Sequence, residues 1–115
     1  MTTLPTLGVL SIADGRLMGP RGTTPATNGI EHVYAAMSHL IGRPAFTHDL
    51  AFYGKAAMQI VVADFPDMAW REEPWTEARD RALNNYGEMV TVPDTWAGAI
   101  ADDRGPISTL TELSQ

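Results

Sequence analysis

The sequence predicts a small α+β domain in which about three helices pack on a three-stranded antiparallel sheet. Asp14-Gly15 lies between two short apolar runs, a pattern typical of a β-hairpin. Residues 88–92 alternate apolar and polar and include β-branched side chains, which favours a third strand. Three longer stretches repeat apolar residues at intervals of three and four, the spacing of one face of a helix. Three strands need helices packed over their apolar face.

Length and composition indicate one globular domain. The chain has 115 residues, so we expect a single domain with its core over about 7–93 and a loop-like extension over 94–115. The net charge of −6 argues against nucleic acid or an anionic membrane as a partner and permits basic partners. With no long apolar run and no signal-peptide pattern, a cytoplasmic location is expected. The absence of cysteine excludes disulfides, thiol nucleophiles and thiolate metal sites.

The first half of the chain is expected to form the hairpin, a loop and a helix. The hairpin strands are placed at about 7–12 and 15–18, and the glycine- and proline-rich residues 19–29 form a loop. Asn28 is the expected N-cap of the helix, with Glu31 as its capping-box partner. The apolar stripe of this helix consists of Ile30, Val33, Tyr34, Met37, Leu40 and Ile41.

A second helix is predicted over residues 48–64, and we expect the rest of the chain to be organised around it. Pro44 disfavours helix at the residue before it, so the preceding helix must end first. Thr47 is the expected N-cap, and Asp49 places negative charge at the positive end of the helix dipole.

A third helix begins near Pro74, a residue well suited to a first turn, and ends at 84–87. The strand at 88–92 follows and is expected to pair with the N-terminal hairpin. Beyond it the chain is loop-like, with a short helical turn expected at 107–113.

Several motifs in this order resemble a family of small uncharacterised proteins of phages and prophages. The resemblance extends over about 7–93 and implies a viral origin, but no activity. It rests on Leu10-Ser11-Ile12, Gly15-Arg16-Leu17-Met18, Met37-Ser38-His39-Leu40, Phe46-Thr47-His48, Phe65-Pro66, Tyr86-Gly87 and Val90-Thr91-Val92-Pro93.

One candidate ligand site is the start of the second helix. Thr47 and His48 lie at a helix N-terminus, where backbone N–H groups favour an anion. If the fold brings Arg43 and Arg16 to the same place, an anionic small molecule or nucleotide could bind there.

The alternative is that these groups are structural. Thr47 would then cap the helix, His48 would cap or pack locally, and the two arginines would pair with Asp14 and Asp49.

Metal, cofactor and catalytic motifs are not recognised. His32 and His39 are seven residues apart and cannot act as an i, i+4 metal pair, so no metal is expected. The sequence has no nucleophile elbow, phosphate loop or dinucleotide fingerprint, so we expect no cofactor and no enzyme. A small hydrolase that uses His48 is the remaining enzymatic alternative.

Tryptophans in connecting segments are candidates for partner binding, because this residue is enriched at interface hot spots. Trp70 and Trp96 lie in such segments, and Glu72 and Glu73 supply acidic neighbours. Both tryptophans could instead cover the core.

These observations favour a phage accessory protein that acts by stoichiometric binding to a host protein, as a counter-defence or host-takeover inhibitor. The alternative is a protein that sequesters a small anionic molecule. A homo-oligomer is also possible, because a three-stranded sheet leaves edges that another copy could pair or cover.

Overall fold

The computed structural model describes residues 2–17 and 30–100. The expected loop at 19–29, the Asn28 cap and the turn at 107–113 lie outside these residues, as does Met18 of the expected second strand. The described elements are β1 (Thr2–Pro5), α1 (Thr6–Asp14), α3 (Ile30–Ile41), α4 (Thr47–Asp64), η1 (Pro66–Met68), α5 (Trp75–Tyr86), β2 (Met89–Val92) and η2 (Asp94–Trp96). Together they form an α+β fold with four α-helices and a two-stranded sheet.

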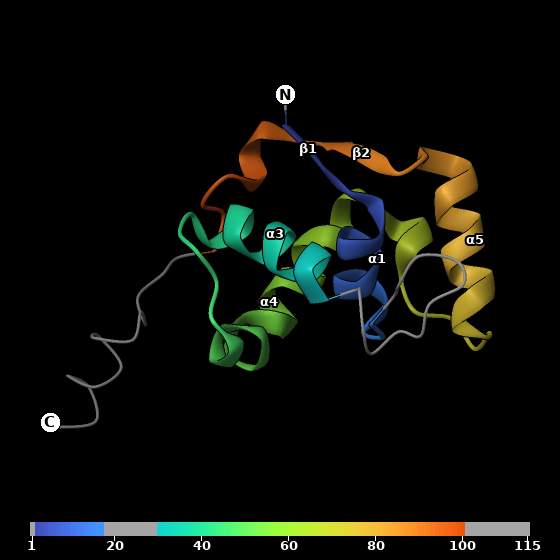
Figure 1. Cartoon of the computed structure of the whole chain (residues 1–115), viewed down its shortest axis with the longest axis horizontal. Helices are drawn as coiled ribbons and strands as arrows, with labels where there is room; N and C mark the ends of the chain where they lie inside the picture. Colours follow the sequence, from blue (N-terminus) through green and yellow to red (C-terminus); the bar gives the residue numbers. More distant parts are fainter. Residues whose placement is uncertain (1, 18–29, 101–115) are drawn as a thin grey trace, which may run out of the picture.

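Helix α1 is the centre of the molecule. It packs against α3, α4 and α5, which lie around it in Figure 1. All nine of its residues are buried. A helix that is apolar on every side is stable only when neighbours cover it completely. The expectation that α4 organises the chain is therefore wrong, because α4 is one of the helices that cover α1.

The predicted hairpin at 7–12 and 15–18 is also wrong. Residues 6–14 are helical, and no strand is present among residues 15–17. Gly15 ends α1 in the left-handed conformation, with φ of 87°, and its N–H donates to the carbonyl of Ser11 at 2.9 Å. Asp14-Gly15 is thus a helix terminus and not a hairpin turn. A short apolar run does not by itself distinguish a buried strand from a buried helix.

The sheet has two strands and not three. β1 pairs with β2 in antiparallel register, from Thr2 opposite Val92 to Pro5 opposite Met89. The strand predicted at 88–92 is confirmed, but its partner is the chain segment before α1. Leu4 and Val90 face each other across the pair and are both buried, so one face of this small sheet belongs to the core.

Hydrogen bonds join the start of α1 to the segment between α5 and β2. The backbone N–H of Thr6 donates to the carbonyl of Glu88 at 2.9 Å, and the Thr6 hydroxyl donates to the carbonyl of Gly87 at 2.7 Å. These bonds fix the two strands relative to α1.

The three amphipathic helices are confirmed as α3, α4 and α5. After β2 the chain returns to the end of α3, where Gly98 and Ile100 donate backbone hydrogen bonds to the carbonyls of His39 and Leu40 at 3.0 and 2.9 Å. Trp96 and Ile100 are buried, so the core extends past residue 93.

None of the helices in 2–17 and 30–100 is long and apolar enough to cross a membrane.

Candidate functional site

A buried ion pair forms the start of α4. The carboxylate of Asp49 is completely buried and accepts two hydrogen bonds from the Arg43 guanidinium, at 2.9 and 3.0 Å. It also accepts the backbone N–H of Phe46 at 2.7 Å. The hydrogen bond from Arg43 lowers the pKa of Asp49 below its ordinary value, against the opposing effect of burial.

Thr47 does not cap α4, contrary to the prediction. Phe46 occupies the N-cap position in an extended conformation, and Thr47 is the first helical residue. Asp49 instead reaches back to the N-cap backbone, which a third-position carboxylate can do. The Thr47 hydroxyl lies 3.1 Å from the hydroxyl of Tyr34, so it links α4 to α3.

Arg16 lies just after the C-terminal end of α1. Its guanidinium donates to both oxygens of Asp14, at 2.6 and 3.0 Å, and to the carbonyl of Glu73 at 2.6 Å. Both arginines of the expected anion site therefore have carboxylate partners, as the structural alternative predicted. Their charges are balanced within the protein.

The two acidic candidates differ in environment. Glu73 accepts two hydrogen bonds from Arg81, at 2.6 and 2.8 Å, and this pairing lowers the pKa of Glu73. The backbone carbonyl of Glu73, which lies just before α5, accepts the hydrogen bond from Arg16. Glu72 is exposed.

The two tryptophan candidates, Trp70 and Trp96, differ in exposure. Trp70 is 58% exposed, after the C-terminal end of α4. Trp96 is 1% exposed, and its indole N–H donates to Asp64 at 2.6 Å. Trp96 is thus a core residue that closes the far end of α4, and only Trp70 lies on the surface.

Aromatic side chains gather at the N-terminal end of α4, and two of them, Phe46 and Phe52, are not among the site residues that the sequence predicts. Phe46 and Phe52 are 50% and 51% exposed. The ring of Phe46 stacks on His48, with centroids 6.0 Å apart and planes 6° from parallel. His48 is itself exposed, and Phe52 follows it one turn later on the same side of the helix.

The exposed side of α4 continues from this group as a nearly uncharged surface. We call it the α4 face; it consists of Phe46, His48, Ala51, Phe52, Lys55, Ala56, Gln59 and Ala63, all exposed. At the C-terminal end it opens into a groove of about 540 Å³. The groove is lined by Tyr53, Ala56, Gln59, Ile60, Ala63, Ala99 and Ile100.

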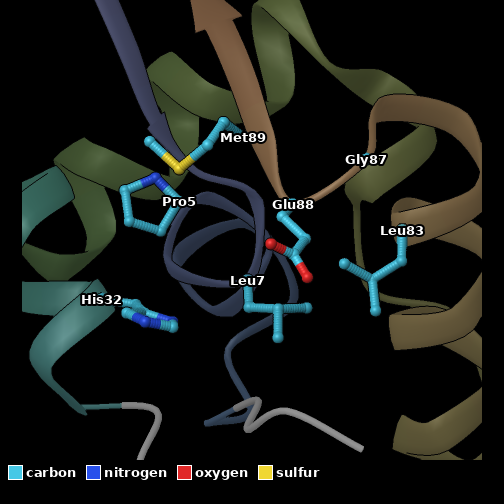
Figure 2. A pocket seen from close by; sticks show the side chains of 7 residues that line it. All are labelled: Pro5, Leu7, His32, Leu83, Gly87, Glu88 and Met89. Carbon is cyan, nitrogen blue, oxygen red and sulfur yellow. The ribbon is translucent and has the colours of Figure 1, made fainter.

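A second cavity, also of about 540 Å³, shares no lining residue with this groove (Figure 2). It is bounded by the end of β1, the start of α1, α3, the end of α5 and the start of β2. Most of its lining is apolar, and two side chains in it can ionise, His32 and Glu88. We call it the α1–α5 pocket. No group of three or more potential metal ligands is found within residues 2–17 and 30–100.

This fold and these surfaces define a small α+β protein whose described part includes the groove at α4 and the α1–α5 pocket and contains no recognised catalytic constellation. A family model described as "Domain of unknown function (DUF7736)" matches residues 4–70, more than half of the chain, and the chain belongs to this family. The matched segment runs from β1 through α4 and η1, so α5 and β2 lie beyond it. No curated protein and no solved structure matched the chain.

Proposed function

We propose that this chain acts by stoichiometric binding to another protein and that the α4 face is the binding surface. The motif resemblance described above supports a phage-encoded accessory protein that works in the cytoplasm of a bacterial host. Counter-defence or inhibition of a host protein is the role that fits such a protein.

The observation behind this proposal is the composition of the α4 face. Two half-exposed phenylalanines lie within about two turns of one helix, next to His48, and the only charged side chain on this face other than the titratable His48 is Lys55. In an acidic protein, an exposed surface with so little charge is unusual. Protein interfaces are enriched in aromatic residues and depleted of charge at their centre. Hot spots are also dominated by large anchoring side chains.

The aromatic end of this face is fixed before any partner arrives. The backbone of Phe46 is tied to Asp49, and the Arg43 guanidinium lies 5.6 Å from the centre of the Phe46 ring. Asp49 is in turn fixed by Arg43. A preorganised anchor loses less conformational entropy on binding, which increases affinity.

The charges around the α4 face indicate what the partner surface contains. Lys55 and His48 are the basic groups on it, whereas the charge of the neighbouring Arg43 is balanced by Asp49. A partner with an apolar patch edged by carboxylates would therefore be complementary. A second copy of this chain is less suitable, because its net charge of −6 would meet an equal charge.

The test is quantitative affinity capture from the host with three tagged proteins: wild type, Phe46→Ser/Phe52→Ser and Thr91→Ala. Thr91 is exposed on β2 and does not belong to the α4 face, so it serves as the control. We expect one host protein to be retained at a fixed stoichiometry by wild type and the control. The double variant should retain it at least tenfold less, because truncating a hot spot costs about 2 kcal/mol or more.

Two results would contradict the proposal. One is equal retention of the same protein by the double variant. The other is a purified wild-type chain whose native mass shows a dimer that the double variant loses, since the face would then be occupied by a second copy. A Trp70→Ser variant distinguishes the α4 face from the other exposed aromatic side chain.

A further inference from the structure

We propose that the α1–α5 pocket binds a small protonated amine with an apolar body. This site is separate from the α4 face and does not depend on the function proposed above. It uses a cavity, a carboxylate and an imidazole that the described protein interactions leave available.

The pocket has the size and lining of a small-molecule site. Such sites usually measure about 300–1,000 Å³ and are mostly apolar, with few polar groups. The cavity of about 540 Å³ has Leu7, Leu83 and Met89 among its walls. Figure 2 shows Leu7 and Leu83 below and beside the opening and Met89 above it. An apolar body such as a phenyl ring would be covered on several sides.

Glu88 supplies negative charge at this cavity. In Figure 2 its carboxylate points into the space between Leu7 and Leu83. The part of the chain that the structure describes gives this carboxylate no ion pair, unlike Asp14, Asp49 and Glu73, which all pair with arginines. Its backbone is fixed by the hydrogen bond from Thr6, so the side chain projects from a defined position.

His32 supplies a second polar group from the opposite wall. It reaches into the pocket from α3 (Figure 2). Its Nδ1 atom is buried and makes no hydrogen bond. A buried polar atom without a partner costs free energy, and a bound N–H group that satisfied the imidazole would recover part of that cost.

These features select the ligand class. A protonated amine would donate to the Glu88 carboxylate, its remaining N–H groups would be available to the imidazole of His32, and its apolar body would contact the leucines. A carboxylate ligand would be repelled by Glu88 and by the overall charge of −6. A neutral alcohol of the same shape would keep the apolar contacts and could still donate to Glu88, but it would lack the attraction between a positive charge and the carboxylate.

The test compares three probes of one shape, 2-phenylethylamine, 2-phenylethanol and phenylacetate, by methyl NMR titration of the full chain. We expect the amine to shift the Leu7, Leu83 and Met89 methyl signals saturably and to bind about two- to fivefold more tightly than the alcohol. Phenylacetate should bind most weakly. Glu88→Gln should weaken amine binding by up to about fivefold and alcohol binding less, because Glu88 is exposed and an exposed ion pair contributes little.

The matched control is Glu72→Gln, which makes the same change of charge at an exposed residue that does not line the pocket. It should bind the amine as wild type does. Three results would overturn the proposal: no saturable shift with any probe, binding of phenylacetate as tight as that of the amine, or equal weakening in Glu72→Gln and Glu88→Gln. A His32→Leu variant that keeps the volume should also bind the amine more weakly, and unchanged binding would exclude His32 from the site.

Discussion

Gly8 should be intolerant of even one additional carbon, because α1 and α3 touch through their backbones at this residue. A Cβ at Gly8 would lie 2.2 Å from the carbonyl oxygen of His32 and 2.5 Å from its carbonyl carbon. Ordinary contacts at such a Cβ begin at about 3.4 Å. In Gly8→Ala the two helices would therefore have to separate by roughly 1 Å, and a backbone carbonyl cannot rotate away as a flexible side chain can.

The magnitude follows from two opposing effects. Overpacking of a close-packed core costs about 1–3 kcal/mol and sometimes more, and contact with backbone places Gly8→Ala at the upper end. Alanine in place of glycine in a helix recovers up to about 1 kcal/mol. We expect a net loss of about 2 kcal/mol in the free energy of unfolding, which for a chain of this size lowers Tm by on the order of 10 °C.

Urea unfolding followed by far-UV circular dichroism measures this loss. The matched control is Gly54→Ala in α4, where a Cβ would meet nothing within 4 Å. The same substitution should there stabilise the protein by up to about 1 kcal/mol. A Gly8→Ala protein as stable as wild type would refute the close packing of α1 on α3.

Three further predictions concern buried polar groups. Asp49→Asn should cost about 3 kcal/mol in urea unfolding, because it leaves Arg43 without its carboxylate. Folding lowers the pKa of Asp49, so the stability that this carboxylate contributes is present above its unfolded pKa of about 4 and is lost as pH falls through its folded pKa. The urea midpoint of wild type should therefore fall more steeply in acid than that of Asp49→Asn. Parallel curves for the two proteins would contradict the pairing of Asp49 with Arg43. Trp96→Phe should lower the free energy of unfolding by about 1–3 kcal/mol through loss of the hydrogen bond to Asp64, and an unchanged denaturation curve would count against that bond. Burial and the Asp67 carboxylate raise the pKa of Tyr86 to about 12. The stability linked to its hydroxyl is therefore complete below the unfolded pKa of about 10 and is lost as pH rises through the folded pKa. The difference between the ultraviolet titrations of wild type and Tyr86→Phe should have its midpoint near pH 12, and a midpoint near 10 would contradict the raised pKa.

The parts of the fold that the sequence predicts correctly are those with a polar side. Helices α3, α4 and α5 each present one apolar stripe, and the spacing of three and four identifies them. Helix α1 has no exposed side, because other elements cover it all round and even Thr6, Ser11 and Asp14 are buried. No solvent-facing stripe therefore marks its period, and its apolar run resembles a strand. β1 contains two threonines and a proline and pairs with a strand almost the whole chain away, which no local pattern indicates.

At the candidate sites, the sequence predicts ion pairs between residues that are close along the chain. It does not predict which side chains are exposed or line a cavity. The pairs of Arg16 with Asp14 and Arg43 with Asp49 join residues close in sequence, and both were available as the structural alternative. The N-cap was missed because Asp49, as an acceptor, takes the place expected for Thr47. The cavity at Glu88 depends on β1, α1, α3, α5 and β2 meeting, so only the fold shows it.

The aromatic surface has one signal in the sequence. Phe52 falls outside the apolar stripe of α4, between Leu50 and Tyr53, which indicates a large side chain that the core does not use. Phe46 precedes the helix and has no periodic position to reveal its exposure. A search for aromatic residues that lie off a helix stripe would have selected the first of these two.

Site-specific photocrosslinking in the host tests the proposed binding face most directly. A benzophenone side chain is placed at residue 52, in the centre of the aromatic group, or at residue 91, on the exposed side of β2. We predict one crosslinked host protein of discrete mass from residue 52 and none from residue 91. The same products from both residues, or only crosslinks between copies of this chain, would contradict the assignment of the α4 face as the surface that binds a partner protein.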